Sequence, residues 1–340
     1  MVTGLSNFID IIGEVVKEKQ RYQQNALEKL PIDVMSRWSE MAHSSKDKER
    51  LSDIYSFVDS YSKMMYDYYS GEKRRNRSGK HRYFYRGQSS IDYNDRLCPG
   101  IYRKTEKHSE YYYLNNMMVR CPLELMKLNS VSKLTFLQHY GCPTRLLDVT
   151  LNPLVSLFFA CEKDDDKDGT VFAFVVNEDD VLFGESDKVL MLSKLAELKE
   201  KEQEILRYLA YFWMIKNKFP QKPQGKYINN DVERFYHSIT MEYPAFERLI
   251  DPIDLLRPVF VQTALDNPRI LKQDGAFLMC GLDTNEDDSN RKIKQYVCRE
   301  ITVPASNKKR IREELEMVGI TQASLFPEVD KVASYLKEKE

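Results

Sequence analysis

The densest group of reactive side chains lies in the stretch LQHYGCPTRLLDVTLNPL, residues 137–154. It carries amide, hydroxyl, imidazole, guanidinium and carboxylate groups: Gln138, His139, Thr144, Arg145, Asp148, Thr150 and Asn152. Ionisable residues gathered beside glycine and proline turns are typical of functional sites, but structural networks look similar. Asp148 follows Arg145 by three residues, so we expect these two to form a buried ion pair close to a ligand pocket. That pair is the structural alternative to a direct catalytic role for Asp148.

Three further motifs place polar groups beside strand-like runs. In YRGQ, residues 85–88, Arg86 offers a planar set of donors suited to phosphate, and Gly87 lets another molecule approach the backbone beside Gln88. In NPRILKQDGAF, residues 267–277, Arg269 and Gln273 precede a glycine and a strand. LFPEVD, residues 325–330, supplies one more acidic candidate, Glu328, which by itself resembles an exposed turn. These motifs indicate ligand binding at strand ends.

The elements that position these groups follow from apolar periodicity. Strands are predicted for HRYFYR, GTVFAFVV, RPVFVQT, GAFLMCG and REITVP, and helices over 5–16, 49–69, 109–128, 131–140 and 308–318. Strands and helices mix without a regular βαβα alternation, which favours an α+β fold with a mixed central sheet. We expect HRYFYR, GAFLMCG and REITVP to share that sheet, with Arg86, His139, Thr150 and Gln273 in one cleft. A single long amphipathic helix is predicted from 190 to 213, outside the cleft as a lid or partner surface.

The composition narrows the class of protein. The chain has 340 residues, 42% of them hydrophobic, and a formal net charge of -1, so no overall charge excess indicates a nucleic-acid or membrane partner. No run approaches the roughly 20 apolar residues of a membrane span, and the first residues do not resemble a secretion signal, so we expect a cytoplasmic protein. The six cysteines form no CxxC pair, and no metal site is predicted. The basic stretch 71–82 is read as a surface loop, with a phosphate or nucleic-acid contact as the alternative.

Three of these stretches carry a resemblance to a known family. YFYRGQ, LTFLQHYGCPTRLLDVTLNPLVSLFFA and NPRILKQDGAF, in this order and spacing, resemble the FRG domain family, which is named for its (F/Y)-R-G signature. The resemblance covers about residues 82 to 336 and is interrupted by a helical insertion. It implies an N-terminal helical region over 1–72 and an FRG domain over 73–340, with the insertion at about 188–247.

FRG domains occur mainly in bacteria and phages, and they resemble more distantly the ADP-ribosyltransferase fold. That resemblance implies an ADP-ribosyltransferase-like sheet and NAD as a substrate. By analogy, Arg86 would hold the pyrophosphate or ribose, Thr150 or Thr144 would line the nicotinamide pocket, and Gln273 or Glu328 would take the late position of the transferase glutamate. The Glu-x-Glu or Gln-x-Glu motif of those enzymes is absent near KQDGAF. The acid–base groups then available are His139, Asp148 and Glu328.

The resulting hypothesis is an effector that transfers ADP-ribose from NAD to a macromolecule, either a protein or a nucleic acid. The resemblance implies a bacterial toxin or anti-phage role, with an antitoxin or other partner protein. The predicted site comprises four catalytic candidates, His139, Asp148, Thr150 and Glu328, and seven ligand-binding candidates, Arg86, Gly87, Gln88, Thr144, Arg145, Arg269 and Gln273. Two alternatives stay open: a non-catalytic module that recognises phosphate or nucleic acid, and an NAD glycohydrolase or other hydrolase.

Overall fold

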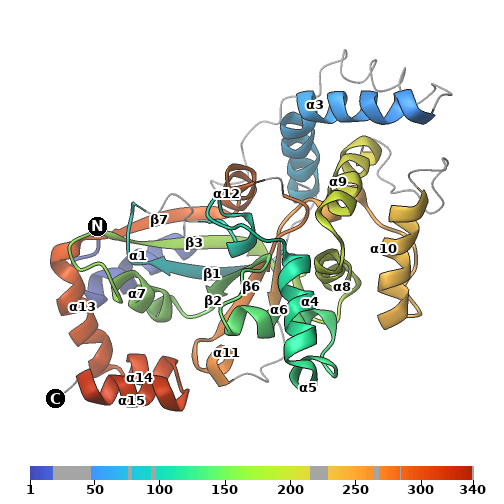
Figure 1. Ribbon diagram of the computed structural model, residues 1–340. Coiled ribbons are helices and arrows are strands. Elements are labelled where there is room, and N and C mark those ends of the chain that lie inside the picture. Colours follow the sequence, from blue (N-terminus) through green and yellow to red (C-terminus); the bar gives the residue numbers. More distant parts are fainter. Residues whose placement is uncertain are drawn as a thin grey trace.

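A mixed seven-stranded sheet is the centre of the molecule (Figure 1). The computed structural model describes residues 1–17, 47–75, 79–92, 97–214, 229–262, 268–283 and 285–338. The strand order is β4-β5-β6-β2-β1-β3-β7, and every neighbouring pair is antiparallel except β4 and β5. The strands are β1 (His81–Gln88), β2 (Leu146–Thr150), β3 (Gly169–Asn177), β4 (Val181–Phe183), β5 (Val259–Gln262), β6 (Gly275–Met279) and β7 (Val297–Val303). The predicted α+β class and the predicted shared sheet are therefore confirmed.

The two central strands β1 and β2 separate soon after they meet. β1 pairs with β3 along all eight of its residues, whereas only Tyr85 lies opposite a β2 residue, Thr150. On its other edge β2 pairs with β6 along its whole length. The sheet thus has a local split between β1 and β2 and is continuous on either side of it. The split is lined by the residues of β1 that follow Tyr85 and by the residues of β2 that precede Thr150.

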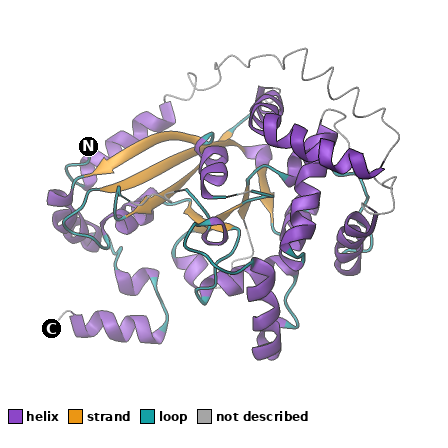
Figure 2. Cartoon of the chain, turned by 45° about the horizontal axis from the view of Figure 1, so that its top comes forward, coloured by secondary structure: helices purple, strands orange, loops and turns teal. Residues whose placement is uncertain are grey.

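Helices cover the sheet in two packed groups (Figure 2). The first group packs with β3 and β7 and consists of α1 (Leu5–Lys17), α7 (Pro153–Cys161), α13 (Ala305–Met317) and α14 (Gln322–Leu325), followed by α15 (Val329–Glu338). The second group packs with β2, β5 and β6 and consists of α3 (Asp47–Arg75), α4 (Glu110–Arg120), α5 (Pro122–Leu125), α6 (Ser130–His139), α8 (Asp187–Lys194), α9 (Glu200–Met214), α10 (Asn229–Glu242) and α11 (Pro268–Lys272). A third apolar cluster between the strands and α12 (Glu286–Lys294) contains stacked Phe84 and Phe260.

The predicted long helix over 190–213 is wrong. The chain forms α8, a short 3-10 turn over Leu195–Glu197 and then α9, with Leu198 in an extended conformation between them. Two α9 side chains hold this break, because the Glu202 carboxylate accepts the Lys199 N–H at 2.8 Å and the Gln203 amide donates to the Leu198 carbonyl at 3.0 Å. Apolar side chains of both helices are buried in the cluster that includes α3. This segment therefore builds core instead of offering an apolar face to a partner.

Candidate functional site

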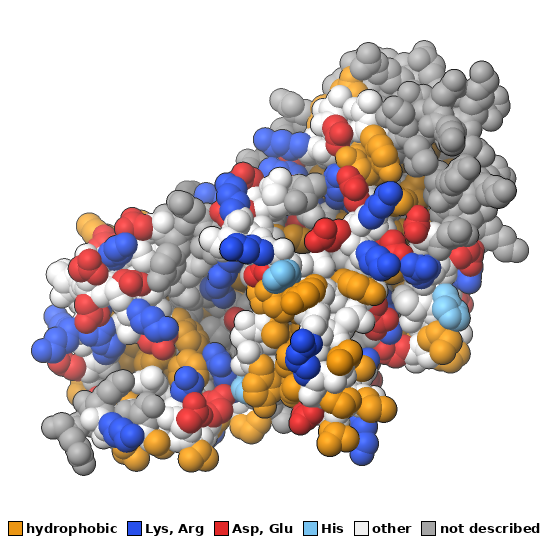
Figure 3. Space-filling view, viewed as in Figure 1, with side chains coloured by type: hydrophobic (Ala, Val, Ile, Leu, Met, Phe, Trp, Pro, Cys, Tyr) orange, Lys and Arg blue, Asp and Glu red, His pale blue; other side chains and the backbone are white. Residues whose placement is uncertain are grey.

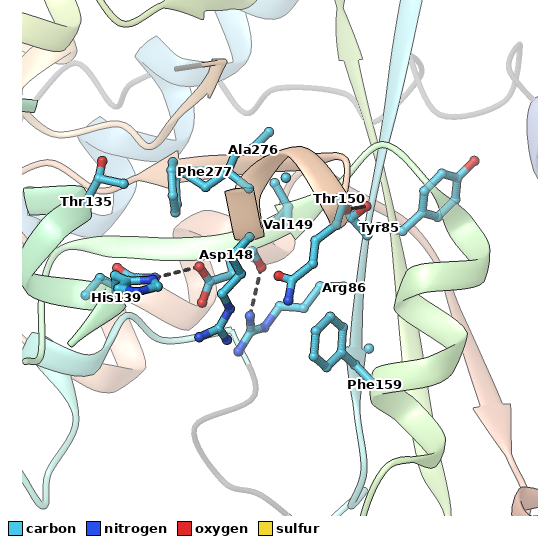
Figure 4. Close-up of a pocket in the computed structure, with 16 residues that line it drawn as sticks. Tyr85, Arg86, Thr135, His139, Asp148, Val149, Thr150, Phe159, Ala276 and Phe277 are labelled. Carbon is cyan, nitrogen blue, oxygen red and sulfur yellow. Dashed lines mark hydrogen bonds between the residues drawn. The ribbon is translucent and has the colours of Figure 1, made fainter. Parts of the chain in front are cut away.

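A cavity of about 260 Å³ opens where β1 and β2 separate, between the two packed groups of helices (Figure 4). Its walls come from β1, α6, β2, α7, α11 and β6. The lining residues are Tyr85, Arg86, Gly87, Thr135, Gln138, His139, Asp148, Val149, Thr150, Phe159, Arg269, Ile270, Gln273, Gly275, Ala276 and Phe277. The predicted cleft that joins Arg86, His139, Thr150 and Gln273 is therefore present. In the space-filling view the surface is hollowed between the group of helices that contains α13 and the group that contains α4 (Figure 3).

Arg86 spans the split between the central strands. Its Nη1 donates to the backbone carbonyl of Asp148 at 2.8 Å, so the guanidinium replaces a backbone donor that a continuous ladder would supply. Figure 4 shows the Arg86 side chain extending from β1 toward Asp148 among the lining residues. A guanidinium has five N–H donors in a rigid plane, and the hydrogen bond to the Asp148 carbonyl helps to fix that plane at the cavity wall.

The Asp148 carboxylate is held by a short relay of side chains. Gln138 Nε2 donates to Asp148 Oδ1 at 2.8 Å, and Gln138 Oε1 accepts from the Thr144 hydroxyl at 2.5 Å. The Thr144 hydroxyl is itself fixed, because it accepts the Leu146 N–H at 3.2 Å. This relay determines which end of the Gln138 amide faces Asp148. It orients an exposed carboxylate toward the cavity, and Gln138, which had no predicted role, is the central member.

His139 and Glu328 meet at the edge of the cavity. His139 Nε2 lies 3.8 Å from Glu328 Oε1, and the two side chains are 21% and 28% exposed. Glu328 Oε2 is buried and accepts no hydrogen bond from the described part of the chain. The distance suits an ion pair when His139 is protonated, although it is longer than a hydrogen bond. A carboxylate from the C-terminal segment is thereby placed beside an imidazole at the cavity mouth.

Thr150 and Gln273 shape the cavity instead of offering reactive groups. The Thr150 hydroxyl donates to the Gln273 carbonyl at 2.7 Å and accepts the Asn152 N–H at 3.0 Å. The side chain of Gln273 donates to the Leu325 carbonyl at 3.1 Å. Asp274 takes a φ of 45°, the left-handed region, and its carbonyl accepts the Leu151 N–H at 2.9 Å. These bonds join β2, the turn before β6 and α14 into one wall.

A second arginine and two aromatic rings complete the lining. The Arg269 guanidinium carbon lies 4.6 Å from the centre of the Phe326 ring, which contacts Phe159 edge to face at 6.0 Å. Arg269 therefore sits on an aromatic surface while it lines the cavity. Phe159 and Phe277 add apolar wall on opposite sides, as Figure 4 shows. Neither ring was predicted to contribute, because both lie within apolar runs that indicate core packing.

Comparison with known proteins now places the central part of this site. Residues 81–169 match the model of the FRG domain. This part of the chain is an FRG domain. No curated protein and no solved structure matches the chain. The matched span supplies Arg86, His139 and Asp148, whereas Arg269 and Gln273 come from later in the sequence. The matched span thus contributes ten of the sixteen lining residues, and the later elements contribute the other six.

Each residue of the Tyr-Arg-Gly signature of the FRG domain has its own structural task. Tyr85 packs beside Val15 and Ala173, and burial raises the pKa of its hydroxyl to about 12. Gly87 lines the cavity, and its lack of a side chain is also required by α7, because a Cβ there would lie 1.8 Å from the Ser156 carbonyl oxygen. The next residue, Gln88, is buried and does not line the cavity.

The predicted ion pair between Arg145 and Asp148 is wrong. Arg145 instead pairs with Glu110 of α4 at 2.7 Å, and both side chains are 1% exposed. Arg145 directly precedes β2 and its side chain is buried against α4, whereas Asp148 within β2 lines the cavity. Burial would lower the pKa of Arg145, but the Glu110 carboxylate outweighs that effect and raises it. Arg145 is a structural residue of the FRG domain and does not line the cavity.

The described residues contain neither a membrane-spanning helix nor a cluster of metal-ligating side chains, and the basic stretch 71–82 is described only in part. No described helix is long and apolar enough to cross a membrane. Within the same residues, no group of three or more His, Cys, Asp or Glu side chains is arranged to hold a metal ion. Part of the basic stretch, residues 76–78, lies outside the described residues. Arg82 from the same stretch pairs with Glu178 at 3.1 Å.

Proposed function

We propose that the cavity binds NAD and that the protein transfers ADP-ribose from it to a macromolecule. The observation that carries the proposal is the convergence of Arg86 and Arg269 with a positioned carboxylate, Asp148, in one cavity. Two guanidiniums suit the pyrophosphate of a dinucleotide. A volume of about 260 Å³ suits the nicotinamide and its ribose, with the remainder of the dinucleotide lying outside along the arginines.

The residues present match the charge changes of the reaction. The bond between ribose C1′ and the nicotinamide nitrogen breaks, and its electron pair leaves with neutral nicotinamide. The ribose then carries positive charge, which the Asp148 carboxylate stabilises while Arg86 and Arg269 hold the phosphates. The acceptor forms a new bond to C1′ and loses a proton, which His139, paired with Glu328, is placed to take. With water as acceptor the same steps give an NAD glycohydrolase.

The second candidate function is recognition of a phosphorylated ligand without catalysis. It is favoured by the two arginines and by the missing transferase motif at KQDGAF. The two functions differ in their need for carboxylates, because a phosphate-binding site does not depend on Asp148 or Glu328. A bacterial toxin or anti-phage role, with a controlling partner protein, follows from the FRG resemblance alone and is part of the proposal.

The first test is release of nicotinamide from NAD by the purified full-length protein. We expect release by the wild type and a loss of about 100-fold in Asp148→Asn, the size typical for removal of one group that stabilises transition-state charge. Glu328→Gln is expected to slow transfer through His139. Asp166→Asn changes an exposed carboxylate of the loop after α7 and serves as the matched control. No release above a protein-free blank, or equal release by Asp148→Asn and wild type, would overturn the proposed catalysis.

A further inference from the structure

One face of α4 carries a row of side chains with the chemistry of nucleic-acid contacts. Tyr112, Asn116 and Arg120 are spaced four apart on one side of α4, and His108, just before the N-cap Ser109, stacks on Tyr112 at the start of the helix. The His108 and Tyr112 rings stack at 4.2 Å with an interplanar angle of 17°, and Tyr112 is 44% exposed. Asn116 donates to the Tyr112 carbonyl at 2.9 Å, and Arg120 donates to Asn116 Oδ1. We call these four residues the α4 row.

The segment that contains the α4 row has more basic than acidic side chains. Residues 103–133 contain six Lys or Arg residues and three Glu residues. Glu110 is buried against Arg145, and Glu106 accepts hydrogen bonds from the Tyr113 hydroxyl and from two backbone N–H groups. Glu124 is the remaining carboxylate, and it is exposed. The six cations of this surface are Arg103, Lys104, Lys107, Arg120, Lys127 and Lys133. Lys104 is offset by Asp287 of α12 at 3.5 Å, so the positive character of this surface comes chiefly from the exposed Lys107, Arg120 and Lys127.

An exposed aromatic ring lies beside a residue that lines the cavity. Next to the α4 row, Tyr113 packs in the same apolar cluster as Phe136 and Cys142. Tyr140, 64% exposed, contacts the Phe136 ring at 4.6 Å and the His139 ring at 4.9 Å. His139 lines the cavity. Tyr140 thus places an exposed ring beside the residue that we propose as the base, and Figure 3 shows basic and apolar side chains over α4 beside the hollow.

We propose that the α4 row and its surrounding cations bind a single-stranded nucleic acid, which is the acceptor of ADP-ribose. Exposed rings such as Tyr112 and Tyr140 stack on bases that are not already stacked in a duplex, and the cations follow the phosphates. The exposed apolar side chains Val119, Leu123 and Met126 nearby would also suit a protein partner, and the acceptor test below separates the two. The identity of the acceptor rests on the proposed transferase function, whereas strand binding does not.

Strand binding is tested by fluorescence anisotropy of a labelled single-stranded oligonucleotide, with the duplex of the same sequence for comparison. We expect saturable binding at low salt that weakens as salt rises, and weaker binding of the duplex. Tyr112→Ala is expected to lower affinity about tenfold or more through loss of base stacking, and Lys107→Glu with Arg120→Glu to lower it further. The matched control is Lys309→Glu with Lys337→Glu, two exposed lysines on α13 and α15. Equal loss in the control, tighter duplex binding or no binding would overturn the proposal.

The acceptor is tested with NAD labelled in its ADP-ribose part, in the presence of the oligonucleotide and, separately, of a mixture of proteins. We expect the label on the oligonucleotide, and less of it with Tyr112→Ala. Nicotinamide is measured in the same reactions, so the two proposals fail differently. Nicotinamide release with the label only on protein or in free ADP-ribose would overturn the nucleic-acid acceptor and leave NAD cleavage standing. Strand binding without any nicotinamide release would overturn the transferase reaction and leave the binding surface.

Discussion

At the residue scale, two charged side chains three positions apart, Arg145 just before β2 and Asp148 within it, have different roles. Arg145 is buried with Glu110, whereas Asp148 is exposed and faces the cavity. The sequence predicts that both matter, because they lie in one polar cluster. It does not reveal the partner of Arg145, because Glu110 lies 35 positions away on a helix and only the packing of α4 against the sheet brings it close.

The different roles of these residues predict different costs of substitution. Glu110→Gln strands the buried Arg145 charge and is expected to lower the free energy of unfolding by about 3 to 5 kcal/mol. Asp148→Asn removes an exposed carboxylate with one side-chain hydrogen bond and is expected to change it by about 0.5 kcal/mol or less. Urea unfolding of both variants beside the wild type measures the two values. Similar losses in the two variants would contradict the assignment of Arg145 as structural and Asp148 as functional.

At the scale of elements, apolar runs predict the strands well because the sheet is covered by helices. Every predicted strand appears in the sheet, and the helices over 5–16 and 131–140 are present as α1 and α6. The break between α8 and α9 could not be predicted, because buried leucines continue at helical spacing through Leu195 and Leu198. Side-chain bonds from Glu202 and Gln203 decide the break, and such bonds leave no periodic signal.

The close crossing of β1 and α7 makes Gly87 a sensitive position. A Cβ at Gly87 would meet the backbone of α7 at Ser156 and Ala160, so Gly87→Ala is expected to lower stability by about 1 to 3 kcal/mol or more. Gly13→Ala in α1 is the control, because a Cβ there meets no atom within 4 Å and alanine favours a helix by up to about 1 kcal/mol. Thermal unfolding measures both. A stable Gly87→Ala protein would mean that α7 can move away from β1.

At the scale of the whole molecule, the cavity is assembled from parts of the chain that are far apart in sequence. The FRG match ends at residue 169, yet Arg269, Gln273 and Glu328 complete the site or its rim. A shared cleft is predictable because each motif joins a polar group to the end or start of a strand. The split between β1 and β2 is not, because it depends on how the two groups of helices pack on either side of it. The predicted boundaries at 72 and at 188–247 stay predictions.

The most direct test of the central claim is a calorimetric titration of NAD into the wild type, Arg86→Ala and Arg86→Lys. We expect saturable binding to the wild type and an affinity at least about tenfold lower in both variants, because charge-assisted hydrogen bonds contribute about 1.5 to 3 kcal/mol. Lysine should not restore binding, since one ammonium cannot replace a planar guanidinium that holds both the Asp148 carbonyl and a phosphate. Arg310→Ala, on exposed α13, is the control. Loss of the Arg86 hydrogen bond to the Asp148 carbonyl is expected to lower the melting temperature by no more than a few degrees. Equal NAD affinity in wild type and Arg86→Ala, or a collapse of the Arg86→Ala melting temperature, would contradict the account.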